Sequence, residues 1–537
     1  MHRVTEVRPA IRAEFENGSR DQLNAENQIL SRAALACHRD KHSLKLASSP
    51  TARCVLRALS LAVILASFGL SGCGAAPPTD PPFIKFVPLT GFDLSTVTEV
   101  HYTIAAKPGS VSKPVHVEYS MSALASRHYL IENSLTLPVF GLYAGYENQV
   151  AVELERGSGD AISFQLTIPT TDYVDPSGIY SQPNIVMPRA PDSTLGFSFM
   201  FIKSAIGSPV IIDTDGEVRW IAPGIPDSFS STFTGDGFII GDPGKPKVYR
   251  LGLDGRVSDG ELPSSSYTDF HHNIDHGKNG FLGEVDAANG GVKSLESNII
   301  EFQDSSVISI ANHWDLAAIL TAHMSSQGDD AAAFVRPGID WFHSNSAIYD
   351  SRDDSVIVSS RENFVIKLDY KTGAVIWILG DPTKYWYTFP SLRAKALTLL
   401  PGGLYPIGQH ALSITSDGLL MLFNDGLGSA NSVPAGETRT YSAVSAYSID
   451  EKSMTAQNTW NYDAGQTIFS AVCSSAYGAP DKSILVDYAF ADKGTQALLV
   501  GLDSNHSVVF EFEYPTSGCN TSWNARPIAL DDLKIDR

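Results

Sequence analysis

The sequence has little cysteine, few positive charges and no long hydrophobic run. Its 537 residues include 5 cysteines, and 39 Lys and Arg stand against 59 Asp and Glu, a formal net charge of −20. Broad nucleic-acid binding needs clustered cations, so this balance argues against a nucleic-acid partner. No apolar stretch reaches the roughly 18 residues that a membrane-spanning helix needs, which excludes a polytopic membrane protein. The cysteine spacing matches no zinc motif, and we expect neither a metal nor a cofactor.

The N-terminal region is typical of an exported lipoprotein. Arg53 and Arg57 precede an apolar stretch at 58–70 that has the length of a signal peptide. The stretch ends in Leu-Ser-Gly-Cys, which resembles a bacterial lipobox and predicts lipidation of Cys73. The alternative is an ordinary secretory signal followed by a chance cysteine.

These features predict how the N-terminal region is divided. We expect a leader at 1–72, in which 51–72 are the lipoprotein signal and 1–50 precede the true start. A tether at 73–82 follows, rich in proline. The mature protein is then exported and faces the periplasm, held to the membrane, the outer one by analogy, by its lipid alone.

Two cysteines remain beyond the leader, Cys473 and Cys519. In an oxidising compartment they either pair as a disulfide or stay as buried free thiols, and the spacing does not decide between the two.

The body of the chain is predicted to be all-β. Residues 83–170 contain short runs of β-branched and aromatic residues at strand-like spacing, which favour a small N-terminal β-sandwich. A segment rich in Pro, Ser and Asp at 171–193 is predicted to be a linker. The remaining residues, 194–537, are predicted to form a six-bladed β-propeller.

Six repeated hairpins support the propeller. Each is a strand, a tight polar turn and a second strand, and such repeats at blade-like intervals are typical of propellers. They lie at 210–220, 247–257, 299–310, 365–380, 444–460 and 499–512.

Between successive hairpins lies a second recurring unit, a strand, a turn and another strand. Three of these units begin with a histidine. His272 and His410 each stand seven residues before the first residue of a turn pair, Asn-Gly and Asp-Gly, and His343 stands ten residues before Asp-Asp. The same position in successive blades is the same place in space, at the start of the innermost strand. We therefore expect the three imidazoles to meet around the central channel.

Other polar residues fall near the same positions. Arg361 ends the strand that follows the Asp-Asp turn, and Asn345 faces the same side of its strand as His343. Ser474, or its neighbour Ser475, takes the histidine position in the last blade and is a candidate substrate-binding hydroxyl. A cluster of histidines also suits a metal, but a guanidinium beside it opposes a cation and favours a tetrahedral anion.

One aromatic group admits two interpretations. The run Tyr-Trp-Tyr at 385–387 stands in an insertion before the His410 unit. It either forms an aromatic wall for a phenolic substrate or packs the insertion.

With these residues the chain resembles the bacterial arylsulfate sulfotransferase family of exported six-bladed propellers. The resemblance is carried by His-His-Asn at 271–273, by His343 with Asn345, by Ser-Ser-Arg ending at Arg361, and by Gln409-His410. It implies transfer of a sulfuryl group from a phenolic sulfate ester to an acceptor phenol, without a nucleotide sulfate donor. It also implies that His410 is the nucleophile and is transiently sulfated.

The resemblance and the chemistry together give an expected division of roles. Sulfuryl transfer needs donors aimed at three equatorial oxygens, and His272, His343, Asn345 and Arg361 are the candidates. His272 or His343 would act as the general base, and the sequence does not say which. The oligomeric state, monomer or homodimer, also stays open. The alternatives are a non-catalytic propeller lipoprotein that serves as a binding or assembly scaffold, and a hydrolase in which water replaces the phenol.

Overall fold

The computed structural model describes residues 82–536 apart from 223, 226, 290–291 and 306. The predicted leader, the predicted lipidation site Cys73 and most of the predicted tether lie outside the described residues. Within the described part, none of the helices has the length and the apolar character needed to cross a membrane.

The N-terminal domain is a two-sheet sandwich. Buried and more exposed residues alternate along β2 (Val97–Ile104) and β6 (Glu147–Arg156), as expected for strands with one face on a core. One sheet has the order β1 (Ile84–Leu89), β5 (Ser134–Phe140), β4 (Leu130–Ile131), and the other has the order β34 (Leu533–Ile535), β3 (Val115–Ser120), β2 (Val97–Ile104), β6 (Glu147–Arg156), β7 (Ala161–Pro169). The short helices η1 (Leu94–Thr96) and α2 (Met121–Ser126) belong to this domain.

Six sheets of four or five strands, counted over the described residues, form the blades of the propeller. The first three blades, with the innermost strand named first, have the following orders. They are β33 (Asn524–Ile528), β9 (Phe199–Lys203), β10 (Val210–Asp213), β11 (Val218–Ile221); β12 (Ser231–Phe233), β13 (Gly237–Gly241), β14 (Lys247–Gly252), β15 (Val257–Glu261); and β16 (Tyr267–His276), β17 (Phe281–Asn289), β18 (Val292–Gln303), β19 (Ser309–Asp315).

The remaining blades follow the same plan, and two of them gain a fifth, outer strand. They are β20 (Ser344–Asp350), β21 (Ser355–Ser360), β22 (Val365–Asp369), β23 (Val375–Leu379); β25 (His410–Ile414), β26 (Leu420–Asn424), β27 (Ala443–Asp450), β28 (Thr455–Tyr462), β24 (Thr398–Leu399); and β29 (Ser475–Gly478), β30 (Ile484–Phe490), β31 (Gln496–Leu502), β32 (Val508–Pro515), β8 (Asn184–Met187).

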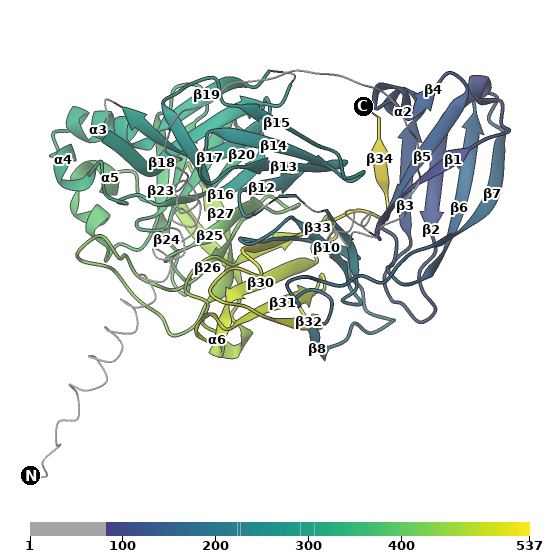
Figure 1. Cartoon of the computed structure of the whole chain (residues 1–537). Coiled ribbons are helices and arrows are strands. Elements are labelled where there is room, and N and C mark those ends of the chain that lie inside the picture. Colours follow the sequence, from purple (N-terminus) through teal and green to yellow (C-terminus); the bar gives the residue numbers. More distant parts are fainter. Residues whose placement is uncertain (1–81, 223, 226, 290–291, 306, 537) are drawn as a thin grey trace, which may run out of the picture. The chain divides into compact units, whose positions relative to one another are not determined.

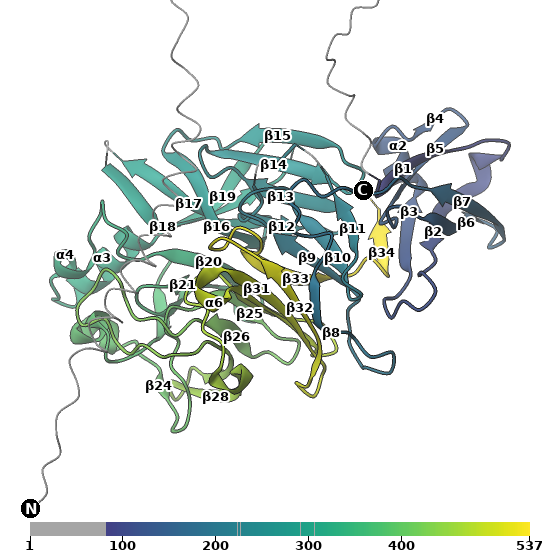
Figure 2. The same cartoon turned by 60° about the horizontal axis from the view of Figure 1, so that its bottom comes forward.

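These sheets confirm the predicted all-β fold, a six-bladed propeller preceded by a sandwich. Each of the six predicted hairpins is an antiparallel pair in the outer half of one blade, for example β22 with β23 and β31 with β32. The innermost strands contact one another in the order β12, β16, β20, β25, β29, β33. Figure 2 shows β16 and β20 side by side.

Strands from the two ends of the described chain complete the sheets. The late strand β33 pairs with β9 and supplies the innermost strand of the first blade. The early strand β8, which lies in the segment predicted to be a linker, pairs with β32 at the outer edge of the last blade. The C-terminal β34 leaves the propeller and runs parallel to β3 of the sandwich (Figure 1). The sandwich is therefore built from two separate stretches of chain, and the propeller is completed by strands from its own two ends.

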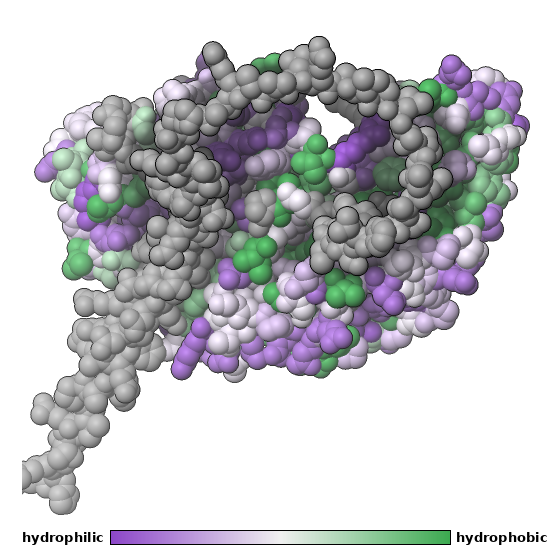
Figure 3. Space-filling view, viewed as in Figure 1, coloured by the Kyte–Doolittle hydropathy of each residue, from purple (hydrophilic) through white to green (hydrophobic). Residues whose placement is uncertain are grey.

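The other helices of the described residues are short and lie in loops of the propeller. They are α3 (Leu316–Ser326), α4 (Ala331–Phe334), η2 (Tyr385–Thr388), α5 (Pro390–Arg393), η3 (Ala464–Gln466) and α6 (Ala491–Gly494). The first four pack with blade four in one hydrophobic core, which contains Trp386 and Phe389. On the face drawn in Figure 3, hydrophobic residues are scattered among hydrophilic ones, as is usual for a water-exposed surface.

Candidate active site

The three predicted histidines meet on the innermost strands of consecutive blades. The ring centroid of His272 on β16 lies 4.7 Å from that of His343 and 6.3 Å from that of His410. His343 directly precedes β20, and His410 begins β25. All three side chains are buried, at 3–5% exposure.

A β-bulge lies at each histidine. The pairing register shifts between Phe270 and Ile274 and again just after His343 and His410. His272 and His343 have positive φ values of 54° and 52°, an unfavourable conformation for a side chain with a Cβ. Bulges re-aim side chains, so here they take the imidazoles out of the regular alternation of the strand. Backbone strain kept at such positions is typical of functional sites.

His410 is held by a buried carboxylate. Its Nδ1 lies 2.8 Å from Oδ2 of Asp425 and 3.1 Å from the carbonyl oxygen of Gly408. Asp425 is fully buried and directly follows β26, the neighbouring strand of the blade. Two acceptors at Nδ1 favour the tautomer with its proton there, which leaves the lone pair on Nε2.

His272 is the uncharged member of the cluster. Burial, together with the neighbouring imidazoles of His343, His271 and His410 and the guanidinium of Arg361, lowers its pKa well below the usual value. Its Nδ1 lies 3.1 Å from Nδ1 of His271, whose own pKa burial lowers to about 4.

The tautomer of this pair follows from its neighbours. Nε2 of His271 lies 3.9 Å from Oδ1 of Asp286, which favours a proton on that nitrogen. His271 Nδ1 then accepts a hydrogen bond from His272 Nδ1. The lone pair of His272 is thereby left on Nε2, which is buried and has no hydrogen-bond partner within the described residues.

His343 is the cationic member. Burial lowers its pKa, but the carboxylates of Asp340 and Glu296 outweigh burial and raise it well above the usual value. Nδ1 of His343 donates to Asp340 and lies 2.9 Å from Oε2 of Glu296. Burial and the nearby Asp340 also raise the pKa of Glu296 above its usual value.

Arg361 and Asn345 come from blade four, as His343 does. The backbone N–H of Arg361 donates to the carbonyl oxygen of His343 at 3.0 Å, and its guanidinium lies 3.2 Å from Glu362. Arg361 is also close enough to His272 to lower its pKa. Asn345 Nδ2 donates to the carbonyl oxygen of Gln409, which ties blade four to the residue before His410.

Ser474 and Ser475 both have protein partners for their hydroxyls. The Ser474 hydroxyl bonds to Ser470, to the Val472 carbonyl and to the Ala489 N–H. The Ser475 hydroxyl bonds to both the N–H and the C=O of Ala525 on β33. Ser474 shares the left-handed backbone of His272 and His343, with φ 71°. No contact that we find in the described residues joins either serine to the histidines.

The two body cysteines form a disulfide, which resolves the choice that the spacing left open. Cys473 precedes Ser474 at the entry to blade six, and Cys519 lies in the segment that leads to β33. Both pack in one small hydrophobic cluster with Phe229, Phe490 and Trp523. The disulfide therefore links the last blade to the strand that completes the first.

The Tyr-Trp-Tyr run packs the insertion. Trp386 is fully buried in the core of blade four, and its indole N–H donates to the Asp381 carbonyl. Tyr385 and Tyr387 pack against the same core. The aromatic residue beside the histidines is instead Trp523, whose ring lies 5.5 Å from that of His272.

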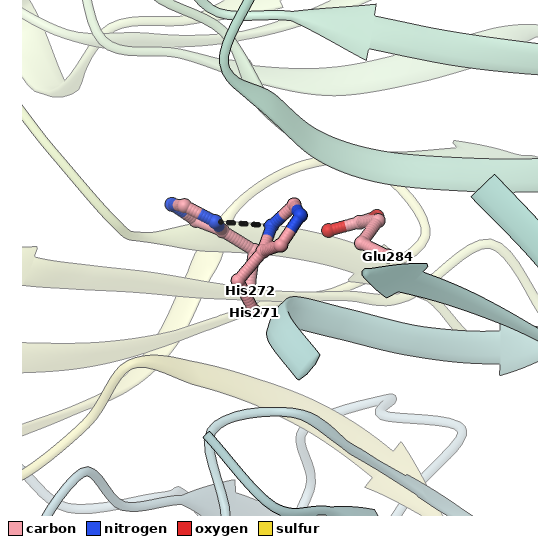
Figure 4. Close-up of side chains that lie close together, drawn as sticks. All are labelled: His271, His272 and Glu284. Atoms are coloured by element: carbon pink, nitrogen blue, oxygen red, sulfur yellow. Dashed lines mark hydrogen bonds between the residues drawn. The ribbon is translucent and has the colours of Figure 1, made fainter. Parts of the chain in front are cut away.

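Three groups of described residues have donor atoms within 4.8 Å of one another and match the ligands of a divalent metal: His271 with His272 and Glu284, His272 with Glu296 and His343, and Glu99 with His101 and Glu155. Figure 4 shows the first group, in which the two rings share a hydrogen bond and the Glu284 carboxylate faces them. A cation in either of the first two groups would lie near protonated His343 and Arg361. Those charges favour an anion at the centre of the site.

Sequence reasoning missed Asp425, Glu296, Asp340 and Trp523. A signal for Asp425 was present: it directly follows the second strand of its blade, as Arg361 does in the preceding blade. Glu296, Asp340 and Trp523 have no comparable signal in the sequence. Glu296 lies on β18 of blade three, and the other two lie in loops.

Comparison with known proteins agrees with this architecture. The family model "Arylsulfotransferase (ASST)" matches residues 186–524, more than half of the chain, and the model "Arylsulfotransferase Ig-like domain" matches residues 82–172. The chain belongs to the arylsulfotransferase family. The two matches coincide with the propeller and the sandwich.

Two curated relatives are named arylsulfate sulfotransferase AssT. The protein from Escherichia coli O6:H1 (strain CFT073) is 28% identical over 346 residues, which cover 52% of this chain and 56% of the relative. The protein from Lelliottia amnigena is 23% identical over 509 residues, which cover 75% of this chain and 83% of the relative. The match to the Escherichia coli protein thus spans little more than half of its length.

Solved structures with a similar course of the chain include the β-propeller domain of Myceliophteria thermophila Cps50 (Swd1), with a TM-score of 0.34 and 10% identity over 62% of this chain and 88% of that one. A europium-containing methanol dehydrogenase has a TM-score of 0.30 and 11% identity over 70% and 77% of the two chains.

Proposed function

We propose that the protein is an arylsulfate sulfotransferase that moves a sulfuryl group from a phenolic sulfate ester to an acceptor phenol through a sulfated His410, without a nucleotide donor. The observation that carries the proposal is the cluster of three imidazoles, one neutral, one cationic and one held by a carboxylate. The membership of the arylsulfotransferase family and the names of the two relatives support it.

The first half-reaction uses His410. Its Nε2 lone pair attacks sulfur, the N–S bond forms as the S–O bond to the aryl group breaks, and the aryl oxygen leaves as a phenolate. Asp425 at Nδ1 stabilises the positive charge that grows on the ring. His410 is regenerated in the second half-reaction. An acceptor phenol attacks the same sulfur from the side that the first phenolate left, and the N–S bond breaks.

Cationic and polar groups bind the sulfuryl oxygens. Protonated His343 and Arg361 supply charge, and Nε2 of His343 has no hydrogen-bond partner among the described residues. Asn345 has a second N–H beside the one that it gives to Gln409. Donors that are already in place for the equatorial oxygens need no reorganisation in the transition state. Together they offer an anionic ester a locally positive site within a chain of net charge −20.

His272 rather than His343 is the general base in this proposal. A base must be uncharged before it accepts a proton, and His272 is the histidine whose pKa is lowered. It takes the proton of the acceptor phenol, and the phenolate released in the next turnover takes that proton back. Protons therefore balance over the cycle.

The location of the protein is part of the proposal. The lipobox-like sequence that ends at Cys73 supports export and attachment of the mature N-terminus to a membrane by a lipid, with the propeller facing the periplasm. Radiolabelled palmitate incorporated by the wild-type chain and not by Cys73→Ala would test the anchor.

One experiment tests the activity. Purified protein is mixed with a chromogenic aryl sulfate, with and without phenol, and the sulfated peptide is mapped by mass spectrometry. We expect release of the coloured phenol to depend on the acceptor, and a sulfuryl group on His410 that is lost in His410→Ala.

The same experiment separates the alternatives. A hydrolase releases the coloured phenol at the same rate without acceptor. A scaffold protein releases none, and His410→Ala then changes only its stability. Either result would contradict the proposal.

A further inference from the structure

Trp523 and Phe229 form an aromatic surface next to the histidine cluster. The Trp523 ring lies 5.5 Å from the His272 ring and 4.9 Å from the Phe229 ring, measured between centroids. The two residues come from the segments before β33 and β12. Both are nearly buried, at 5% and 6% exposure.

Within the described residues we find no acceptor for the indole N–H of Trp523, nor for those of the buried Trp314 and Trp341, whereas three other buried tryptophans have one. Those of Trp220, Trp377 and Trp386 each donate to a carbonyl or carboxylate. A tryptophan in a protein interior usually finds a partner for this group. Of these indoles, that of Trp523 lies next to the His272 ring, where a ligand bound at the histidine cluster can accept from its N–H.

We propose that Trp523, backed by Phe229, is the surface on which the aromatic ring of the phenolic substrate packs, with its indole N–H donating to an oxygen of the bound ester. This inference rests on the proposed function and adds the subsite that selects aromatic substrates. The Trp523 ring lies 5.5 Å from the ring of His272, the proposed base, so an ester whose phenolic oxygen is near His272 has its aromatic ring within reach of the indole.

In-line displacement at sulfur places both phenols on the same side of the sulfuryl group. The leaving phenol departs opposite His410, and the acceptor must approach along the same line, because the second half-reaction is the reverse of the first. One aromatic surface therefore serves both phenols. The affinities for aryl sulfate and for phenol should then change by the same factor when that surface changes.

Packing and a backbone hydrogen bond fix the position of this aromatic surface. Phe229 and Trp523 share a hydrophobic cluster with the Cys473–Cys519 disulfide, and the Trp523 backbone N–H donates to the carbonyl oxygen of Lys203. A ring fixed in this way loses little freedom when a substrate packs on it.

The test compares Trp523→Leu, which removes the ring, with Trp523→Phe, which keeps a ring and removes the N–H. Trp460→Leu on β28, whose ring packs on His506 instead, is the control. For Trp523→Leu we expect the KM for aryl sulfate and the KM for phenol to rise together, roughly three- to tenfold. The Phe variant should show a smaller rise, and the control should match the wild-type protein.

A second measurement does not need an active Leu variant. A nitrophenol bound against Trp523 should quench part of the tryptophan fluorescence of the wild-type protein, and Trp523→Phe should lose that quenching. Sulfation of His410 at saturating donor should persist in both variants. A failure of the wider proposal would instead show as no sulfated His410 in the wild-type protein. The inference is overturned if both KM values stay at the wild-type level in Trp523→Leu, or if the quenching survives in Trp523→Phe.

Discussion

The rings of His272 and His343 lie 4.7 Å apart, yet their pKa values are shifted in opposite directions. The difference is caused by the groups that lie near Nδ1 of each ring. His343 faces Asp340 and Glu296 at 2.9 Å or less, whereas Nδ1 of His272 faces another imidazole and lies 4.0 Å from Glu296. Two side chains of one type thereby acquire two roles, a proton acceptor and a fixed cation.

The first prediction concerns Glu296 and the pH profile. Activity needs neutral His272 and protonated His343, so it should fall on the acid side only below about pH 6.5, the ordinary histidine pKa. On the alkaline side it should fall as pH rises through the raised pKa of His343. Glu296→Gln removes a charge that raises this pKa, so the alkaline limb should move to lower pH.

The rate of sulfuryl transfer measured from pH 5 to 10 checks this prediction. Glu261→Gln, an exposed position on β15, is the control. An alkaline limb that stays in place in Glu296→Gln would show that His343 is not the group that titrates.

The second prediction concerns Asp425. Asp425→Asn keeps the shape of the side chain but removes the charge that stabilises His410 during attack and fixes its tautomer. We expect the single-turnover rate of His410 sulfation to fall about 10- to 100-fold, with little change in donor binding. Asp417→Asn in the exposed turn of the same hairpin should have the wild-type rate. A normal rate in Asp425→Asn would contradict the positioning role.

The third prediction concerns the disulfide. Because Cys473 and Cys519 link the two blades where the ring is completed, replacing both by serine should lower the free energy of unfolding by about 2–4 kcal/mol. Denaturant unfolding of the double variant, compared with the wild-type protein before and after reduction, measures this. If reduction leaves the wild-type midpoint unchanged, the disulfide does not hold the blades together.

The fourth prediction separates two roles for Ser475. Its hydroxyl joins β29 to Ala525 on β33, so Ser475→Ala leaves a buried N–H unpaired and should cost about 1–3 kcal/mol of stability. The KM for both substrates should stay unchanged. A raised KM with unchanged stability would instead support the substrate-binding role expected from the sequence.

Much of the fold could be read from local pattern. Alternating strands around Asp-Gly and Lys-Thr-Gly turns gave the outer hairpin of every blade, because hairpin chemistry is set by a few neighbouring residues. The exchange of β8, β33 and β34 between sheets could not be foreseen. Each is a short, ordinary strand whose partner is chosen by distant parts of the chain.

The sequence by itself determined that His272, His343 and His410 occupy equivalent positions, since a repeat fixes position in space without knowledge of contacts. Only the tertiary structure decided what each imidazole does. Bulges turn the rings out of the strand pattern, and carboxylates such as Glu296 and Asp425 act on them across strands or blades. Charge and burial depend on neighbours in space, and no periodicity along the chain records them.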